Sequence, residues 1–432
     1  MSMTSGLPMM RMTGVIPPLR SSLTVKQGEQ SRAATMLLIG NPGNRRTLGL
    51  QEARSRWGLK PAVLVTYLEL LQAAEAGGEA ISRLLASRLP QAEDQGLLIR
   101  LDAPGEQADV ERSLIGLGAH DREGDDSLLP LSAAARRTGI SAAEAALLPQ
   151  EKGRITYPGQ WFRGYCRLLA MISREVIRLW PKAVWVNAPE EVAVMFDKRA
   201  CQQRLGACGI DIPRRLASGS AISCYEHMIR EMEQDRMNRL FLKLATGSGA
   251  SGVIAYQRHP LTGAEKAVTT IGIEQRDGMQ ILYNSGRLKQ YADHATIRGL
   301  VDWLCGEGVH MEEWIPKAGI AGFSFDIRQL VVAGRACHRI ARLSRSPITN
   351  LHLRNRRLAV EQTGLSTQHI ERAALAAEAA MAAFPGSSVA GVDVLVRSGS
   401  RLPYIIDVNP FGDLLYGVLH EELNPYEWQM KP

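Results

Sequence analysis

Two apolar segments near the C-terminal end of the chain carry polar residues at alternate positions. The segment from Gly391 to Asn409 consists of two such stretches joined by a Ser-Gly-Ser turn, a pattern that predicts a β-hairpin. Because side chains alternate between the faces of a strand, Asp407 and Asn409 share a face. If the hairpin is symmetric about Ser400, Asp393 lies opposite Asp407. Two carboxylates that face each other across a ladder repel, and a bound cation removes that repulsion.

The ligand atoms that this hairpin offers are all oxygens. Asp393, Asp407 and Asn409, here called the hairpin set, suit Mg²⁺, which usually keeps several waters and completes its shell with substrate phosphates. The alternative is a surface hairpin with solvated aspartates. The Val, Ile and Leu residues on either side favour a buried location instead. The sequence therefore predicts a magnesium site on this hairpin.

Length and composition limit the classes of protein that this chain can belong to. Its 432 residues suggest two or three domains, and 45% hydrophobic with 22% charged residues is typical of a globular protein. The net charge of +7 is mild, so it fits an anionic ligand such as a nucleotide and does not indicate nucleic acid. No apolar run approaches the roughly 18 residues of a membrane span. Six scattered cysteines without a C-x-x-C pair predict reduced thiols in a cytoplasmic protein.

The order of elements predicts an α/β organisation. From Met36 onward, short apolar strands alternate with helices, which indicates a parallel sheet in a domain covering 36–190, with a mostly helical stretch over about 120–180. After Ile210 the composition shifts toward strands. Residues 1–35 show no periodicity. A transit peptide is one reading of them; we favour a disordered tail or a mis-assigned start with Met36 as initiator.

A glycine-rich loop follows an apolar strand that contains Lys243. A lysine within such a strand needs an anionic partner, and a loop of this kind can present backbone N–H groups to phosphates. A Rossmann motif is excluded because a strand follows the loop, a Walker A motif because Gly-Lys-Ser/Thr is absent, and a kinase because the catalytic aspartates are missing. A plain glycine-rich hairpin is the alternative. The loop residues expected to bind phosphate are Gly247, Ser248, Gly249, Ser251 and Gly252.

Three weaker signals accompany these two. The segment His310–Pro316 predicts a strand end with backbone groups free to pair with an adenine edge. Arg328 lies between apolar neighbours on a predicted strand, where a guanidinium group can bind phosphate or carboxylate bidentately. Lys198 follows Asp197 at a predicted helix N-terminus, a position that favours phosphate. Taken alone, the first signal is better explained by an ordinary strand end and the third by a solvated helix turn.

Taken in order, these signals resemble the ATP-grasp superfamily over about residues 190–420. The resemblance is to the branch that contains bacterial glutathione synthetase and the ribosomal-protein glutamate ligases, and Gly391-Val-Asp393 with Asp407-Val-Asn409-Pro is its most specific part. It implies an ATP-grasp fold with an N-terminal parallel-sheet α/β domain. A lid subdomain over 191–310 and a catalytic subdomain over 311–432 would follow.

The resemblance also implies how ATP would be held. Lys198 and Lys243 would bind its phosphates, and the loop from Gly247 to Gly252 would close over them. Backbone groups of Glu313 and Ile315 would bind adenine. Mg²⁺ would be held by the hairpin set.

The same resemblance implies three catalytic residues. Arg328 would stabilise the transferred phosphoryl group, and Arg342 and Asn350 would approach substrate and phosphate. The chain departs from the branch at Asp407, where the branch usually has Glu, and no ribose-binding residue is evident after Pro316.

These expectations describe an ATP-dependent carboxylate–amine (or thiol) ligase that acts through an acyl phosphate and releases ADP and phosphate. Its partners would be a small-molecule carboxylate and an amine or peptide, with a homodimer as one arrangement. Two alternatives stay open: a regulatory or scaffold protein that binds ATP without ligation, and a ligase that modifies a peptide or protein. Residues 157–161, Tyr-Pro-Gly-Gln-Trp, are expected to form a turn, with Trp161 either in a substrate pocket or in simple packing.

Overall fold

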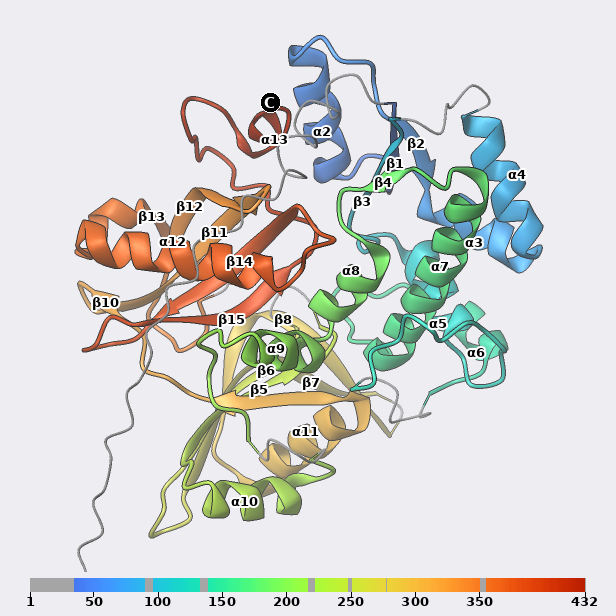
Figure 1. Ribbon diagram of the computed structural model, residues 1–432. Helices are drawn as coiled ribbons and strands as arrows, with labels where there is room; N and C mark the ends of the chain where they lie inside the picture. The colour runs from blue at the N-terminus through green and yellow to red at the C-terminus, as the bar shows by residue number, and fades with distance from the viewer. Residues whose placement is uncertain are drawn as a thin grey trace, which may run out of the picture.

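The chain folds into three β-sheets with helices packed against them (Figure 1). The computed structural model describes residues 35–89, 96–132, 139–216, 222–247, 251–276, 278–349 and 355–431. The first sheet is parallel and the other two are antiparallel. The expected α/β class with a parallel N-terminal sheet is therefore confirmed. The predicted tail, residues 1–34, lies outside the described residues.

The parallel sheet has the strand order β2-β1-β3-β4 and is covered on both faces. Its strands are β1 (Met36–Gly40), β2 (Val63–Thr66), β3 (Leu98–Leu101) and β4 (Val184–Trp185). The helices around it are α2 (Arg45–Arg56), α3 (Tyr67–Glu75), α4 (Gly78–Arg88), α5 (Ala108–Leu117), α6 (Ala142–Ala146), α7 (Pro158–Leu179) and α13 (Pro425–Gln429). Because side chains alternate along β1, Leu37 and Ile39 pack with α3, α4, α5 and α7, whereas Met36 and Leu38 pack with α2 and α13.

The second sheet has the strand order β8-β7-β6-β5-β9. Its elements are α10 (Tyr225–Gln234), β5 (Arg239–Leu244), β6 (Val253–Arg258), β7 (Glu265–Arg276), β8 (Met279–Tyr291), α11 (His294–Glu307) and β9 (Val309–Glu313). One face buries Leu240, Leu242 and Met311 against α10 and α11. The opposite face carries Phe241 and Lys243. Phe241 packs there with Ile348, which belongs to the part of the chain that forms the third sheet.

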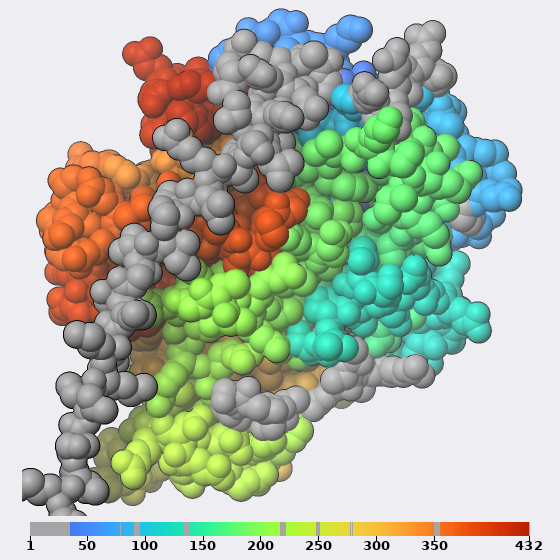
Figure 2. Space-filling view, in the orientation of Figure 1, coloured from blue at the N-terminus to red at the C-terminus, as the bar shows by residue number. Residues whose placement is uncertain are grey.

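The third sheet has the strand order β13-β12-β11-β14-β15, with β10 paired to β11. Its elements are α8 (Pro189–Phe196), α9 (Lys198–Ala207), β10 (Gly319–Ile320), β11 (Phe323–Val332), β12 (Arg335–Ser344), β13 (Arg356–Leu358), the 3₁₀ turn η2 (Val360–Gln362), α12 (Thr367–Ala382), β14 (Val389–Val396) and β15 (Pro403–Asn409). Helix α12 covers one face. In the space-filling view, the green residues around α8 and α9 lie between the teal N-terminal part and the orange-red third sheet (Figure 2).

Parts of the N-terminal region differ from expectation. The stretch 120–180 is less helical than expected, because its described helices are only α6 and α7. Pro158 and Gly159 do not form a turn but begin α7, since proline suits the first helical turn. Gln160 is buried and bonds to the carbonyls of Ile115 and Ile140, while Trp161 stacks on Tyr165 with ring centroids 5.6 Å apart. These two side chains therefore pack within the N-terminal part of the molecule.

One asparagine joins the parallel sheet to the third sheet. Asn187, just after β4, donates through its amide nitrogen to the carbonyls of Val389 (2.7 Å) and Pro410. Its amide oxygen accepts from the N–H groups of Ser388 and Val389, both at 3.1 Å. All four of these hydrogen bonds reach residues about 200 positions away, so Asn187 fixes the start of β14 and the end of β15 against the N-terminal sheet.

The six cysteines all lie among the described residues and form no disulfide, and Cys166, Cys201, Cys305 and Cys337 are buried. Among the described residues, no helix is both long and apolar enough to cross a membrane.

Candidate functional site

The free face of the third sheet carries the candidate site. Ile327, Ala341, Val392 and Val394 point to the side covered by α12. Their sequence neighbours point to the other side, because side chains alternate along each strand. The residues on that free face are Asp326 and Arg328 of β11, Arg342 of β12, Asp393 of β14, and Asp407 and Asn409 of β15.

The predicted carboxylate pair is present. Asp393 and Asp407 are direct register partners of the antiparallel β14–β15 ladder, as expected, although the register shifts by one residue between Asp393 and Val394, so the hairpin is not symmetric about Ser400 throughout. Oδ1 of Asp393 is 2.7 Å from Arg328 Nη1, and Oδ2 is 3.1 Å from Arg342 Nη2. Burial, helped by Asp326 and Asp407, raises the pKa of Asp393 despite the two arginines. Buried Oδ1 forms an ion pair but no aligned hydrogen bond, so it retains capacity for a further positive ligand.

Lys198 connects this pair to the glycine-rich loop. Its Nζ is 3.3 Å from Asp407 Oδ2 and donates to the Gly247 carbonyl at 2.9 Å. Asp197 caps the first turn of α9 by accepting from the Arg199 N–H, so Lys198 occupies the first helical position as predicted. Burial raises the pKa of Asp407, but Lys198, with Lys243 and Arg328, outweighs it and holds that pKa below its ordinary value.

The hairpin set fits a magnesium ion that is completed by other ligands. Nδ2 of Asn409 donates to the Gly391 carbonyl at 3.0 Å, which places its Oδ1 on the other side of the amide group. Among the described residues, no group of three or more His, Cys, Asp or Glu side chains is assembled for a metal. Two carboxylates and one amide oxygen are nevertheless the oxygen donors that Mg²⁺ prefers, with water and phosphate supplying the rest.

Arg328 is held from two sides. Besides Asp393, it contacts Asp413, whose Oδ2 is 2.7 Å from Arg328 Nε. Burial raises the pKa of Asp413, but Arg328 and Arg46 outweigh it, so this carboxyl is ionised. Asp413 lies in the loop after β15 and was not among the predicted site residues.

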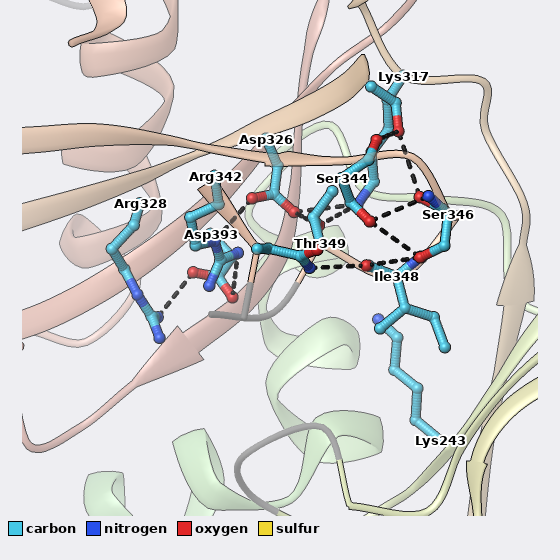
Figure 3. Close-up of polar contacts among 12 residues, drawn as sticks. Lys243, Lys317, Asp326, Arg328, Arg342, Ser344, Ser346, Ile348, Thr349 and Asp393 are labelled. Atoms are coloured by element: carbon cyan, nitrogen blue, oxygen red, sulfur yellow. Dashed lines mark hydrogen bonds and ion pairs between the residues drawn. The ribbon is translucent and has the colours of Figure 1, made fainter. Parts of the chain in front are cut away.

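A buried polar network continues from Arg342 (Figure 3). Its Nε donates to Asp326 Oδ1 at 2.7 Å, and the other carboxylate oxygen of Asp326 is 3.0 Å from Lys317 Nζ and also bonds to Thr349. Burial raises the pKa of Asp326, but Arg342 and Lys317 outweigh it and hold that pKa well below its usual range. Neither Lys317 nor Asp326 was among the predicted site residues. The signal that could have found them is that both are charged residues in an apolar context.

Lys243 approaches from the second sheet. Figure 3 shows its amino group directed toward the segment around Ile348. The expected anionic partner is supplied within the protein by Glu312 of β9, at 2.5 Å. Burial raises the pKa of Glu312, but Lys243 and His310 outweigh it and lower that pKa to about 2. Burial lowers the pKa of His310, which bonds to Glu312 at 2.8 Å and is therefore a neutral donor at pH 7.

The glycine-rich loop begins where β5 ends, and a strand follows it as expected. A Cβ at Gly247 would lie 2.9 Å from Leu244 Cβ, and one at Gly252, where φ is +65°, would lie 2.5 Å from two Leu244 side-chain atoms. Glycine is therefore required at both positions. Ser251 precedes β6 and is half-buried. The other predicted loop residues, Ser248 and Gly249, lie outside the described residues, as does Asn350.

The segment His310–Pro316 offers fewer free backbone groups for an adenine edge than expected. The Glu313 N–H donates to the Arg214 carbonyl at 2.8 Å, so any adenine contact from this residue must use its carbonyl group. Ile315 is 5% exposed. The N–H of the preceding residue, Trp314, donates to the Arg239 carbonyl.

The site as a whole holds nearly balanced charge. Its basic side chains are Lys198, Lys243, Lys317, Arg328 and Arg342, and its acidic ones are Glu312, Asp326, Asp393, Asp407 and Asp413. Most of them are buried or nearly so. Because the cations come from both antiparallel sheets and from α9, an anionic ligand placed between the sheets would meet several of them at once, and added divalent charge would compensate the carboxylates.

Comparisons with known proteins give structural likenesses only. No family model matches the sequence, and no curated protein matches it. An ATP-grasp ligase, PsnB, complexed with a phosphomimetic variant of its minimal precursor, Mg and ADP, is 11% identical over 92% of this chain and 97% of that one, with a TM-score of 0.46. D-cycloserine synthetase DcsG is 14% identical over 91% and 98%, with a TM-score of 0.48.

A third structure is the D-alanine–D-alanine ligase from Bacillus anthracis complexed with ATP. It is 12% identical over 92% of this chain and 95% of that one, with a TM-score of 0.42. Because all three identities are below 25% and all three scores below 0.5, what this chain binds and does must follow from its own residues.

Proposed function

We propose that this chain is an ATP-dependent ligase of the ATP-grasp type that joins a carboxylate to an amine or thiol. The observation that carries the proposal is the convergence of Lys198 and Lys243 on the carboxylate pair Asp393–Asp407. These four side chains come from α9, the second sheet and the β14–β15 hairpin, and Lys198 and Lys243 both lower the pKa of Asp407. A set of cations beside two oxygen ligands suits a nucleotide triphosphate with its metal.

The nucleotide would lie between the two antiparallel sheets. Lys198 and Lys243 would exchange Asp407 and Glu312 for phosphate oxygens, and the loop between β5 and β6 would cover those oxygens. The hairpin set would hold Mg²⁺, which neutralises phosphate charge and orients the reacting group. Lys243 and Glu312 separate in this scheme, so the buried His310–Glu312 pair would keep Glu312 from being left without a hydrogen bond.

The carboxylate substrate would be activated beside Arg328 and Arg342. Its oxygen attacks the γ-phosphorus of ATP and ADP leaves, which gives an acyl phosphate; the amine or thiol then attacks the acyl carbon, loses a proton, and phosphate departs. Arg328 is fixed by Asp393 and Asp413, and Arg342 by Asp326 and Asp393, so both guanidinium groups are oriented before the substrate arrives. Such fixed charges stabilise negative charge that develops in the transition state.

The experiment that tests this function is product analysis. The protein is incubated with Mg-ATP, pooled amino acids and small acids, and hydroxylamine as a trap. ADP together with a hydroxamate supports the ligase mechanism and identifies the acid. AMP instead of ADP would overturn it, and nucleotide binding without ADP would favour a regulatory or scaffold role.

The metal assignment predicts the effect of Asp407→Asn. Loss of one carboxylate from the hairpin set should reduce ADP formation at saturating substrate by at least about 100-fold, because the metal loses charge and orientation. Asp109→Asn, on the exposed surface of α5, serves as the matched control and should keep the wild-type rate. Full turnover in Asp407→Asn would show that this carboxylate does not hold the metal.

A further inference from the structure

The loop that follows β15 is contacted by arginines from three separate elements. Arg328 of β11 contacts Asp413, as described above. Nη1 of Arg46, in α2, donates to the Phe411 carbonyl at 2.8 Å. Nη1 of Arg357, in β13, donates to the Tyr416 carbonyl at 3.1 Å. The Arg45 guanidinium carbon lies 5.9 Å from the centre of the Tyr416 ring.

Three of these arginines have no carboxylate in direct contact among the described residues. Arg46 and Arg357 donate to backbone carbonyl groups, and Arg45 lies over the Tyr416 ring. Within the described ranges, none of the three forms an ion pair with a carboxylate. Arg328 and Arg342 differ, because each touches two carboxylates. Carbonyl contacts orient a guanidinium group but leave its positive charge and several N–H donors available to an anion.

These free charges adjoin the reaction centre. Arg357 is the register partner of Arg342 across the β12–β13 ladder, so both side chains leave the same face of the third sheet. Arg46 acts electrostatically on Asp413, which in turn touches Arg328. The six residues from Phe411 to Tyr416 are five chain steps, which span at most about 17 Å, so the arginines around this loop lie within reach of one short peptide or extended small substrate.

We propose that Arg45, Arg46 and Arg357 form a second anion subsite, which binds a carboxylate of the substrate other than the one that is activated. The substrate class is therefore an aliphatic dicarboxylate, either as a free acid or as a peptide that carries at least two carboxylates. This inference rests on the proposed function, since Arg328 and Arg342 take the first carboxylate. Arginine suits the task because its planar fork binds carboxylates with two parallel hydrogen bonds.

Calorimetric binding to the intact protein tests the subsite without turnover. The probes are glutarate and its monocarboxylate counterpart pentanoate, and triglutamate and triglutamine, each with Mg²⁺ and a non-hydrolysable ATP analogue. Glutarate or triglutamate should bind at least about tenfold more tightly than its counterpart. Tighter binding of glutarate identifies a free acid as the source of the carboxylate, and tighter binding of triglutamate alone identifies a peptide.

The paired substitution Arg45→Gln with Arg357→Gln should abolish that tenfold preference and leave binding of pentanoate and of triglutamine unchanged. Both side chains are exposed, so the fold should tolerate the change. Arg230→Gln, at an exposed position of α10, is the matched control and should retain the preference. The subsite is refuted if neither acidic probe is preferred, or if the double variant keeps the preference.

Failure of this inference can be told apart from failure of the proposed function. A protein that prefers glutarate through these arginines but releases no ADP with any acid retains the subsite and is not a ligase. A protein that forms hydroxamates from monocarboxylates, at rates unaffected by the double substitution, is a ligase without the second subsite.

Discussion

At the residue scale, the site depends on buried charges that each need a partner. Asp326 is 1% exposed and lies between Arg342 and Lys317, which are also buried. Burial lowers the pKa of Lys317, and the negative charge of Asp326 opposes that lowering without cancelling it. A network of this kind adds little net stability, because desolvation opposes the attraction, but the loss of one member leaves the others uncompensated.

Asp326→Asn should therefore destabilise the protein by about 3–5 kcal/mol, since two buried cations would lose the carboxylate that they share. Urea unfolding followed by circular dichroism measures the change. Glu361→Gln is the control, because its partner Arg339 is a surface residue, and its cost should stay below about 1 kcal/mol. Equal effects of the two substitutions would contradict this account.

At the element scale, two helices of the N-terminal part are held unusually close by glycines. A Cβ added at Gly164 of α7 would lie 1.8 Å from the Leu114 carbonyl oxygen of α5, and one at Gly118 would lie 2.0 Å from the Gln160 carbonyl oxygen. These obstructions are backbone atoms, which cannot rotate away. The contact between α5 and α7 thus requires glycine on both sides.

Gly164→Ala should lower the free energy of unfolding by about 1–3 kcal/mol or more, because α5 and α7 must separate. Gly299→Ala is a matched substitution inside α11, where nothing lies within 4 Å of the added Cβ. It should stabilise the protein by roughly 0.5–1 kcal/mol through helix propensity. In thermal or denaturant unfolding, the two substitutions should change the free energy of unfolding in opposite directions. A change in the same direction would contradict the prediction.

The sequence indicated elements best where the pattern is local. The β14–β15 register followed from alternation around one turn, and the strand after the glycine-rich loop followed from its apolar run. Helix α3 was missed although Thr66 and Glu69 form a capping box at its start. The Lys243–Glu312 and Asp326–Lys317 contacts were beyond prediction, because they depend on which strands become neighbours and not on local spacing.

At the scale of the whole molecule, the residues after β15 fasten the third sheet to the parallel sheet. Nε2 of His338 is 2.8 Å from the Leu423 carbonyl, and His420 packs against Trp428 with ring centroids 4.5 Å apart. Nδ1 of His338 is buried without a hydrogen-bond partner. Burial lowers the pKa of both histidines, so the folded protein holds them neutral.

Acidification should weaken this attachment. Because the folded pKa of His338 is below the unfolded value of about 6.5, the unfolded chain takes up the proton more readily, and stability falls as the pH drops below about 6.5 toward the folded pKa. The unfolding free energy, measured between pH 7.5 and 5.5, should decline by at most about 1.4 kcal/mol per pH unit for each such group. His338→Gln, which keeps a side-chain donor near Leu423, should flatten this slope. An unchanged slope would place the effect in other groups.

The packing of Tyr426 and Met430 against Met36 and Leu38 bears on how the protein is made. The first strand emerges from the ribosome early, yet one face of it is covered by side chains that are synthesised nearly four hundred residues later. Until residue 430 has left the exit tunnel, α2 alone can pack on this face, and the positions of Tyr426 and Met430 on it stay unfilled. The parallel sheet can therefore be completed only after most of these residues have been synthesised.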